Sequence, residues 1–229
     1  MSCFLNYHSD IVMSTCYNKQ VMLYIIDELE MLDDNFSEKF QKLLSNDRFT
    51  KYQRLHSSLN KNASVAVYLL LRLGLRDVYG IDEIVEFDYA ERGKPYLKDY
   101  PNIHFSLSHS HNIAACAISN VSVGVDVQKI NHISDKVAKR VLTSDEYELF
   151  LKSSTPNDYF CKIWTMKESY LKQSGVGITL ELNTIASESI CDKKYFKKDN
   201  YYCCVCAKEA EIMQVRYIGR DCFEQLYCR

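Results

Sequence analysis

The sequence has little of what marks low-complexity, secreted or membrane-spanning chains. Its 229 residues include only 7 glycines and 3 prolines, which leaves little room for flexible linkers. No apolar run is long enough to cross a membrane, and Met1 to Asp10 lacks the basic and apolar regions of a signal peptide. A net charge of −2 argues against a surface for nucleic acid or for an anionic membrane. We therefore expect a cytoplasmic globular protein.

Cysteine is abundant, with ten residues, but its context does not favour disulfides. Disulfide frameworks belong mostly to small secreted chains, whereas this chain is long enough to bury a sizeable core. The tightest group, Cys203, Cys204 and Cys206, lacks C-x-x-C spacing and falls in a run that is typical of a strand. We interpret these cysteines as reduced core residues, and a metal site is the less favoured alternative.

The hydrophobic pattern predicts a mixture of strands and helices in both halves of the chain. Strands are expected at 21–26, 103–107, 113–119, 122–128, 201–207 and 211–218. Helices are expected at 36–56, 60–79, 134–141, 144–152 and 156–173. The strands and helices do not follow a clean βαβ order, so the predicted class is α+β. No linker separates the halves, so two lobes would pack directly together.

The strand from Ser122 to Gln128 carries two oxygen-bearing side chains on one face. Because side chains alternate along a strand, its three valines form one apolar face, which belongs in a core. Asp126 and Gln128 lie together on the other face, where Gly124 is expected to leave open space. Such oxygen ligands suit a hard cation such as Mg²⁺. A solvated outer face is the alternative, and this strand alone does not decide between them.

The helix that contains residues 160–172 offers an acid and a base at the border of its apolar stripe. Glu168 follows Trp164 by one turn, and Lys172 follows Glu168 by one more, with Lys167 adjacent. A carboxylate at such a border needs a partner. The simplest interpretation is a Glu168–Lys172 pair along the helix, worth about 0.2–0.5 kcal/mol. A magnesium ion with a pyrophosphate would use the same mixture of charges.

The run Ser106 to His111 follows the apolar residues of a predicted strand. Ser108 and His109 are expected at the mouth of that strand, where a hydroxyl and an imidazole can bind phosphate oxygens. Polar turn residues with a surface histidine are the alternative.

Basic residues recur in two further places. Arg48, Lys51 and Arg54 lie three residues apart in a predicted helix, which gives one cationic ridge, and Lys94 lies between Gly93 and Pro95. Cationic ridges are usually solvated helix faces, so this signal is weak by itself.

Together these motifs resemble the signature of the 4′-phosphopantetheinyl transferase superfamily. The run 123–126 (VGVD) is similar to the G-x-D strand of that family, and 164–172 (WTMKESYLK) is similar to its W-x-x-K-E-x-x-x-K helix. Residues 93–95 and 108–110 match two upstream blocks, and the resemblance covers about residues 45–185. The length is similar to that of the long, monomeric members.

The resemblance implies an α+β fold of two similar lobes related by a pseudo-twofold axis, here 1–119 and 120–229. It implies transfer of the 4′-phosphopantetheine group of coenzyme A to a serine of an apo carrier protein, with Mg²⁺ (holo-[acyl-carrier-protein] synthase activity, EC 2.7.8.7). The implied partners are acyl, peptidyl or aryl carrier proteins of fatty-acid, polyketide and nonribosomal-peptide synthesis. No nucleic acid and no membrane is expected.

The resemblance also implies roles for single residues. Asp126, Gln128 and Glu168 would bind the metal, and Glu168 and Lys172 would act in catalysis. The expected contacts to coenzyme A come from Arg48, Lys51, Lys94, Ser108, His109 and Lys172.

Gln128 departs from the family pattern, which often has Glu at this position. An amide oxygen can ligate Mg²⁺ but brings no charge, so we expect weaker metal binding with activity retained. A module that binds coenzyme A or a carrier without turnover, and a magnesium-dependent nucleotide phosphohydrolase, are the alternatives.

Overall fold

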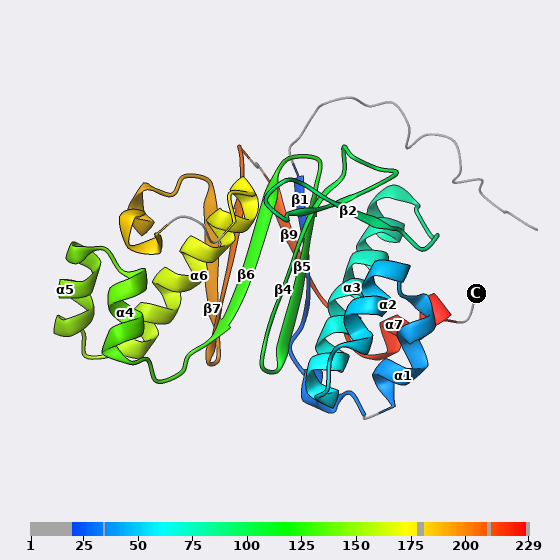
Figure 1. Ribbon diagram of the computed structural model, residues 1–229, viewed down its shortest axis with the longest axis horizontal. Coiled ribbons are helices and arrows are strands. Elements are labelled where there is room, and N and C mark those ends of the chain that lie inside the picture. The colour runs from blue at the N-terminus through cyan, green and yellow to red at the C-terminus, as the bar shows by residue number, and fades with distance from the viewer. Residues whose placement is uncertain (1–19, 34, 178–180, 210–211, 228–229) are drawn as a thin grey trace, which may run out of the picture.

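The computed structural model describes residues 20–33, 35–177, 181–209 and 212–227 (Figure 1). The expectation about Met1 to Asp10 therefore lies outside the described residues, as does the beginning of the predicted 1–119 lobe. In the described part of the chain, no helix is both long enough and apolar enough to cross a membrane.

The first half of the chain builds a sheet and the helices that cover it. Its main elements are β1 (Gln20–Ile26), α1 (Phe36–Phe40), α2 (Asn46–Gln53), α3 (Ser58–Tyr79), β2 (Phe87–Tyr89), β3 (Pro95–Leu97), β4 (His104–Ser110) and β5 (Ile113–Ser119). Single 3-10 turns lie at Leu29–Met31 and Gln41–Leu43. The long helix α3 ends where Gly80 adopts φ 69°, a left-handed conformation that a side chain would disfavour. The predicted helix at 36–56 is thus divided into α1, a 3-10 turn and α2.

The second half begins with β6 (Val123–Lys129) and contains the helix that carries the predicted acidic residue. The other elements are α4 (Asp135–Val141), α5 (Ser144–Lys152), α6 (Pro156–Ser174), β7 (Lys193–Lys198), β8 (Tyr201–Ala207), β9 (Ile212–Tyr217) and α7 (Asp221–Tyr227), with 3-10 turns at Leu182–Thr184 and Ser187–Ser189. Pro156 starts α6 and Gly175 ends it at φ 68°, as expected for proline and glycine at these helix positions. Apart from the divided helix at 36–56, the predicted strands and helices are confirmed within the described residues, and the class is α+β.

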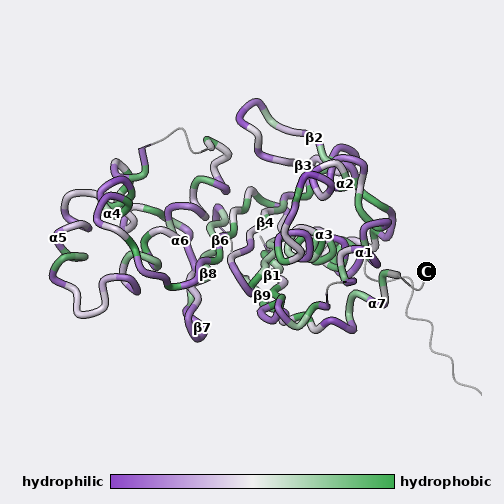
Figure 2. The backbone as a smooth tube through the Cα atoms, turned by 60° about the horizontal axis from the view of Figure 1, so that its bottom comes forward, coloured by the Kyte–Doolittle hydropathy of each residue, from purple (hydrophilic) through white to green (hydrophobic). Residues whose placement is uncertain are grey.

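The strands form two main sheets and one hairpin. The first sheet has the order β4-β5-β1-β9, the second has the order β6-β8-β7, and β2 pairs with β3 alone. β1 runs antiparallel to β5 but parallel to β9, so the chain crosses back after β8 to complete the first sheet. Figure 2 shows the hairpin of β2 and β3 standing out from the body of the molecule, beside α2.

The two sheets pack face to face between two layers of helices. In Figure 1, α3 lies against the outer face of the first sheet and α6 against that of the second. The helices α1 and α2 pack on α3, and α5 packs on α6. One core lies beneath α3, which Figure 2 shows as a largely hydrophobic helix. A second core lies between the sheets, where the valines of β6 meet Val21, Leu23 and Ile25 of β1. The prediction that the valine face of β6 is buried is confirmed.

The space expected beside Gly124 is filled by α6, so that expectation is wrong. A Cβ atom on Gly124 would lie 2.1 Å from the carbonyl oxygen of Ser169 and 2.3 Å from the backbone nitrogen of Gln173. Glycine is needed there because the helix backbone approaches the strand backbone directly. This contact fixes the position of α6 relative to β6.

The C-terminal segment returns to the first half of the molecule. β9 pairs with β1, and Phe223 of α7 packs against Phe36 and Phe40 of α1. Lys39 also donates hydrogen bonds of 2.7 and 2.6 Å to Glu224. The pseudo-twofold relation and the division at residue 119 stay predictions.

Cys203, Cys204 and Cys206 are buried in β8, as interpreted from the sequence. The cysteines among the described residues are free thiols, and in that part of the chain no three His, Cys, Asp or Glu side chains are grouped so that they could hold a metal ion. Burial raises the pKa of the Cys203 thiol, so this thiol stays protonated and takes no part in thiolate chemistry.

Lys167, which the sequence places beside Glu168, is buried away from it and anchors α5 to α6. Its ammonium lies 2.5 Å from Glu146 Oε2 and donates to the carbonyl oxygens of Val141 at 2.7 Å and Leu182 at 3.1 Å. Burial lowers the pKa of Lys167. Burial alone would raise the pKa of Glu146, but hydrogen bonds from Lys167 and from the Ser187 backbone lower it overall.

Lys167→Met is expected to lower the free energy of unfolding at neutral pH by about 3–5 kcal/mol, because it leaves the Glu146 carboxylate buried without its cation. A depressed carboxyl pKa contributes stability above the unfolded-state pKa, and that stability is lost as pH falls through the folded-state value. The difference between wild type and variant should therefore narrow toward acid pH. Urea unfolding at several pH values measures it.

The exposed pair of Lys152 with Glu148 provides the matched control. Lys152→Met should change the free energy of unfolding by less than about 1 kcal/mol. A similar cost for both lysine variants would contradict the anchoring role of Lys167.

Candidate active site

Two adjoining cavities form one cleft between the two halves of the molecule. Their volumes are about 350 and 510 Å³, and both are lined by Arg48 and Lys51 of α2 and by Glu168 and Lys172 of α6. The larger cavity also contains Ser108, His109, Asp126 and Gln128, and the smaller one contains Lys94. All of the site residues predicted from the sequence therefore line this cleft.

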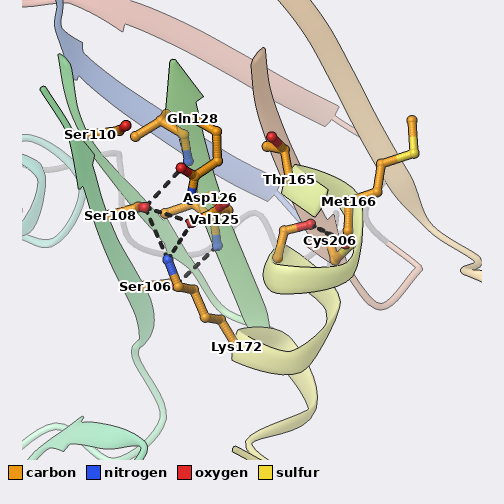
Figure 3. Close-up of polar contacts among 12 residues, drawn as sticks. Ser106, Ser108, Ser110, Val125, Asp126, Gln128, Thr165, Met166, Lys172 and Cys206 are labelled. Atoms are coloured by element: carbon orange, nitrogen blue, oxygen red, sulfur yellow. Dashed lines mark hydrogen bonds and ion pairs between the residues drawn. The ribbon is translucent and has the colours of Figure 1, made fainter. Parts of the chain in front are cut away.

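Asp126 lies at the floor of the cleft with only 2% of its surface exposed. Its Oδ1 accepts hydrogen bonds from Ser108 Oγ at 2.8 Å and from Lys172 Nζ at 2.7 Å. Its Oδ2 accepts from Gln128 Nε2 at 3.0 Å (Figure 3). A solvated outer face, the alternative considered for this strand, is therefore excluded for Asp126.

Glu168 and Lys172 do not form the helix pair that their spacing suggests. The ion pair of Lys172 is with Asp126, and in the described part of the chain the Glu168 side chain has neither a hydrogen bond nor an ion pair. The pKa of Glu168 is raised, first by burial and then by the negative charge of Asp126, against the opposing effect of Lys172. Glu168 is thus a half-buried carboxylate that lacks a cation.

The oxygen donors of the cleft fit a hard divalent cation. Asp126, Gln128 and Glu168 supply two carboxylates and an amide oxygen to one cavity, which is the ligand chemistry that Mg²⁺ prefers. The raised pKa of Glu168 supports this fit, since a nearby positive charge would relieve the repulsion between the two acids.

Ser108 and His109 lie within β4, not beyond its end, because the strand continues to Ser110. Ser108 is buried, and its hydroxyl binds Asp126. His109 lies on the cleft wall. Its pKa is lowered by desolvation and then by the positive charges of Lys172, Lys51 and Arg48, so the neutral imidazole is favoured.

Arg48 and Lys51 enter the cleft, whereas Arg54, the third residue of the predicted ridge, is exposed and does not line either cavity. Arg48 is buried, and its Nη2 donates to the carbonyl oxygen of Ser64 at 2.9 Å. Within the described residues, Arg48 Nε has no hydrogen-bond partner. A buried guanidinium with an unused donor is well suited to a phosphate oxygen.

Lys94 crosses from the β2–β3 hairpin to the second half of the molecule. Its Nζ donates to the carbonyl oxygens of Gln173 at 2.8 Å and Val123 at 3.3 Å. Burial lowers its pKa to about 8. The ammonium thus binds the C-terminal end of α6, where carbonyl groups lack partners and cations are favoured.

The apolar wall of the smaller cavity was missed from the sequence. It is formed by Phe87, Pro95, Phe105 and Leu171. Two of these residues belong to strands of only three residues, which are too short to show a periodic pattern. The alternation of Phe87 and Tyr89 before Gly93 is the signal that could have indicated them.

Comparisons with known proteins show which family the sequence is similar to. The family model described as the 4′-phosphopantetheinyl transferase superfamily matches residues 122–213. The chain is 32% identical over 158 residues to the 4′-phosphopantetheinyl transferase Sfp of Bacillus subtilis, an alignment that covers 68% of this chain and 70% of that protein.

Two further relatives share shorter regions. The 4′-phosphopantetheinyl transferase gsp of Aneurinibacillus migulanus is 39% identical over 120 residues, which are 51% of this chain and 49% of the relative. The 4′-phosphopantetheinyl transferase HetI of a Nostoc species is 35% identical over 144 residues, which are 59% of this chain and 61% of the relative. With the cleft and these similarities together, the chain belongs to the 4′-phosphopantetheinyl transferase superfamily.

Proposed function

We propose that this protein transfers the 4′-phosphopantetheine group from coenzyme A to a serine of an apo carrier protein and releases 3′,5′-ADP. The observation that carries the proposal is the unpaired Glu168 beside Asp126, in a cleft rimmed by the cations Arg48, Lys51 and Lys172. A pyrophosphate needs such cations, and a hydroxyl nucleophile needs such a carboxylate. Membership of the family supports the same activity.

In this reaction the serine oxygen attacks the β-phosphorus of coenzyme A, and the bond from that phosphorus to the oxygen bridging the two phosphates breaks. The Glu168 carboxylate takes the hydroxyl proton, a role for which its raised pKa suits it. Lys172 provides positive charge for the leaving phosphate. Asp126 holds Lys172 in the cleft through their 2.7 Å ion pair.

Asp126, Gln128 and Glu168 would hold a magnesium ion. The ion would neutralise charge on the pyrophosphate when bound. Because Gln128 brings no charge, the metal affinity rests on the two carboxylates, and we expect it to be modest.

Arg48, Lys51, His109 and Ser108 would form the phosphate side of the coenzyme A site. Lys94, held by the Gln173 carbonyl oxygen, would supply positive charge at the nucleotide end of the cleft. We further propose a monomer of two similar lobes that serves acyl, peptidyl or aryl carrier domains.

The direct test mixes the protein with apo carrier, coenzyme A and Mg²⁺ and weighs the carrier by mass spectrometry. A gain of one phosphopantetheine group per carrier is the expected result, and a chelator should abolish it. Nucleotide cleavage with an unchanged carrier would instead indicate a phosphohydrolase. Binding of coenzyme A with neither product would indicate a module without turnover, and a panel of carriers from the three pathways guards against a wrong partner.

A further inference from the structure

The two sheets pack face to face, and at one side of this packing an edge strand of each sheet lies beside that of the other, with no backbone hydrogen bond between their described residues. β4 is an edge strand of the first sheet and β6 is an edge strand of the second. The two strands lie side by side (Figure 1), but in the described part of the chain neither forms a backbone ladder with the other. Unpaired N–H groups at a buried edge are costly, so something else must satisfy β6.

Three serines of β4 take the place of that ladder. The backbone N–H groups of Val125, Val127 and Lys129 donate to the hydroxyl oxygens of Ser106 at 3.0 Å, Ser108 at 3.3 Å and Ser110 at 3.2 Å. Figure 3 shows the three serines in a row along the strand that faces β6.

The spacing of the serines matches the spacing of the groups that they bind. Alternate residues of an extended strand point the same way, so serines two apart on β4 meet N–H groups two apart on β6. Ser106 and Ser108 are each only 6% exposed, so water does not replace them. We call this row of Ser106, Ser108 and Ser110 the serine seam.

One member of the serine seam, Ser108, also contacts the buried acidic residue of the cleft, Asp126. While the Ser108 hydroxyl accepts from the Val127 backbone, it donates to Asp126 Oδ1 at 2.8 Å. The cations Arg48 and Lys51 belong to the first half of the molecule, whereas Asp126 belongs to β6 in the second. The seam is therefore one of the polar contacts, together with those of Lys94, that hold the acidic side of the cleft against the half that carries Arg48 and Lys51.

We propose that the serine seam positions Asp126 for magnesium-assisted binding of coenzyme A, with Ser106 and Ser110 acting through the β6 backbone and Ser108 acting on the carboxylate itself. The inference rests on the proposed function for the identity of the ligands. Ser106 and Ser110 are positioning residues. Ser106 lines the smaller cavity, but its hydroxyl is engaged by the Val125 N–H, and Ser110 lines neither cavity.

The test measures the affinity for coenzyme A by calorimetry with and without Mg²⁺. In the double variant Ser106→Ala/Ser110→Ala, the increase in coenzyme A affinity that Mg²⁺ gives should be about tenfold smaller than in wild type, since two hydrogen bonds that hold the β6 backbone are removed. Its affinity without Mg²⁺ should stay within about twofold of wild type, because the cations of α2 are untouched. Ser110→Ala should reduce the increase in coenzyme A affinity that Mg²⁺ gives, whereas Ser110→Thr, which keeps the hydroxyl, should retain it.

Ser119→Ala is the matched control, since Ser119 is a buried strand serine that donates to the Gln20 carbonyl oxygen at 2.7 Å within the first sheet. It should lower thermal stability and leave the Mg²⁺-dependent gain unchanged. The proposal is overturned if Mg²⁺ increases the coenzyme A affinity of the seam variants as much as that of wild type. It is also overturned if Ser119→Ala reduces this increase as much as the seam variants do, or if Mg²⁺ does not increase the affinity of wild type. If the double variant does not fold, the pair Ser110→Ala and Ser110→Thr decides. A wild type that shows the gain but transfers nothing would refute the proposed function and not the seam.

Discussion

Glu168→Gln is expected to abolish phosphopantetheine transfer and, in the absence of Mg²⁺, to raise the melting temperature at neutral pH. A lost general base costs about 10²–10⁴-fold in rate. The gain in stability follows from the raised pKa of Glu168, which reflects burial and repulsion from Asp126. An amide of the same shape removes both penalties, and functional residues are often destabilising in this way.

The pH dependence of this gain has a definite sign. A carboxyl group with a raised folded-state pKa favours folding fully below its unfolded-state pKa, and this contribution is lost as pH rises through the folded-state value. The difference in melting temperature between Glu168→Gln and wild type should therefore be positive at pH 7. It should vanish at acid pH, where Glu168 is protonated in both states.

Calorimetric melting with a chelator, repeated with Mg²⁺, measures both effects. Each kcal/mol should appear as about 2–4 °C in a protein of this size, and Mg²⁺ should raise the melting temperature of wild type but not that of Glu168→Gln. Asp126→Asn is the contrasting variant, since it loses transfer and also its ion pair with Lys172. It should be less stable by about 1–3 kcal/mol. If Glu168→Gln kept wild-type transfer, or melted below wild type without Mg²⁺, the assignment of Glu168 would be wrong.

Gly124→Ala is expected to have the second largest effect, a loss of both folding stability and phosphopantetheine transfer. The added methyl group would overlap the Ser169 carbonyl oxygen and the Gln173 backbone nitrogen, and a helix backbone cannot move aside as a side chain can. Overpacking of this kind costs about 1–3 kcal/mol and occasionally more. Because α6 also carries Glu168 and Lys172, a displacement of about 1 Å would reduce transfer by about 10²-fold in the molecules that still fold.

Gly219→Ala is the matched control, since a Cβ atom there would meet no atom within 4 Å. It should change the free energy of unfolding by no more than about 0.5 kcal/mol. Urea unfolding and the carrier mass assay measure both variants. Equal stability of Gly124→Ala and Gly219→Ala would show that α6 is not held against β6 by this contact.

The long periodic elements could be predicted from the sequence, and the short or edge elements could not. α3 and α6 combine helical periodicity with a glycine just beyond the last residue, and β6 shows clean alternation. By contrast, β7 has the sequence KKYFKK and exposes most of its side chains. Lysines are common on edge strands, but this polar composition does not show the hydrophobic alternation from which a strand is predicted. The pairing of β9 with β1 joins residues about 190 positions apart, which no local pattern encodes.

The candidate site was predictable as a set of residues but not as a set of contacts. The motifs were sufficient to bring Asp126, Glu168 and Lys172 to one cleft. The sequence suggested that Lys172 pairs with Glu168, because helix spacing is local information, whereas the actual partner Asp126 comes from another element. Ser106 carried no signal of its own, since its role depends on which strand lies beside β4.

The return of the last strand to the first sheet affects how the protein is made. On a ribosome β1 emerges about 190 residues before β9, the strand that covers its outer edge. Until then, one edge of the apolar run VMLYII stays open to pairing with another chain. The first sheet can therefore be completed only after the second sheet and its helices have been translated.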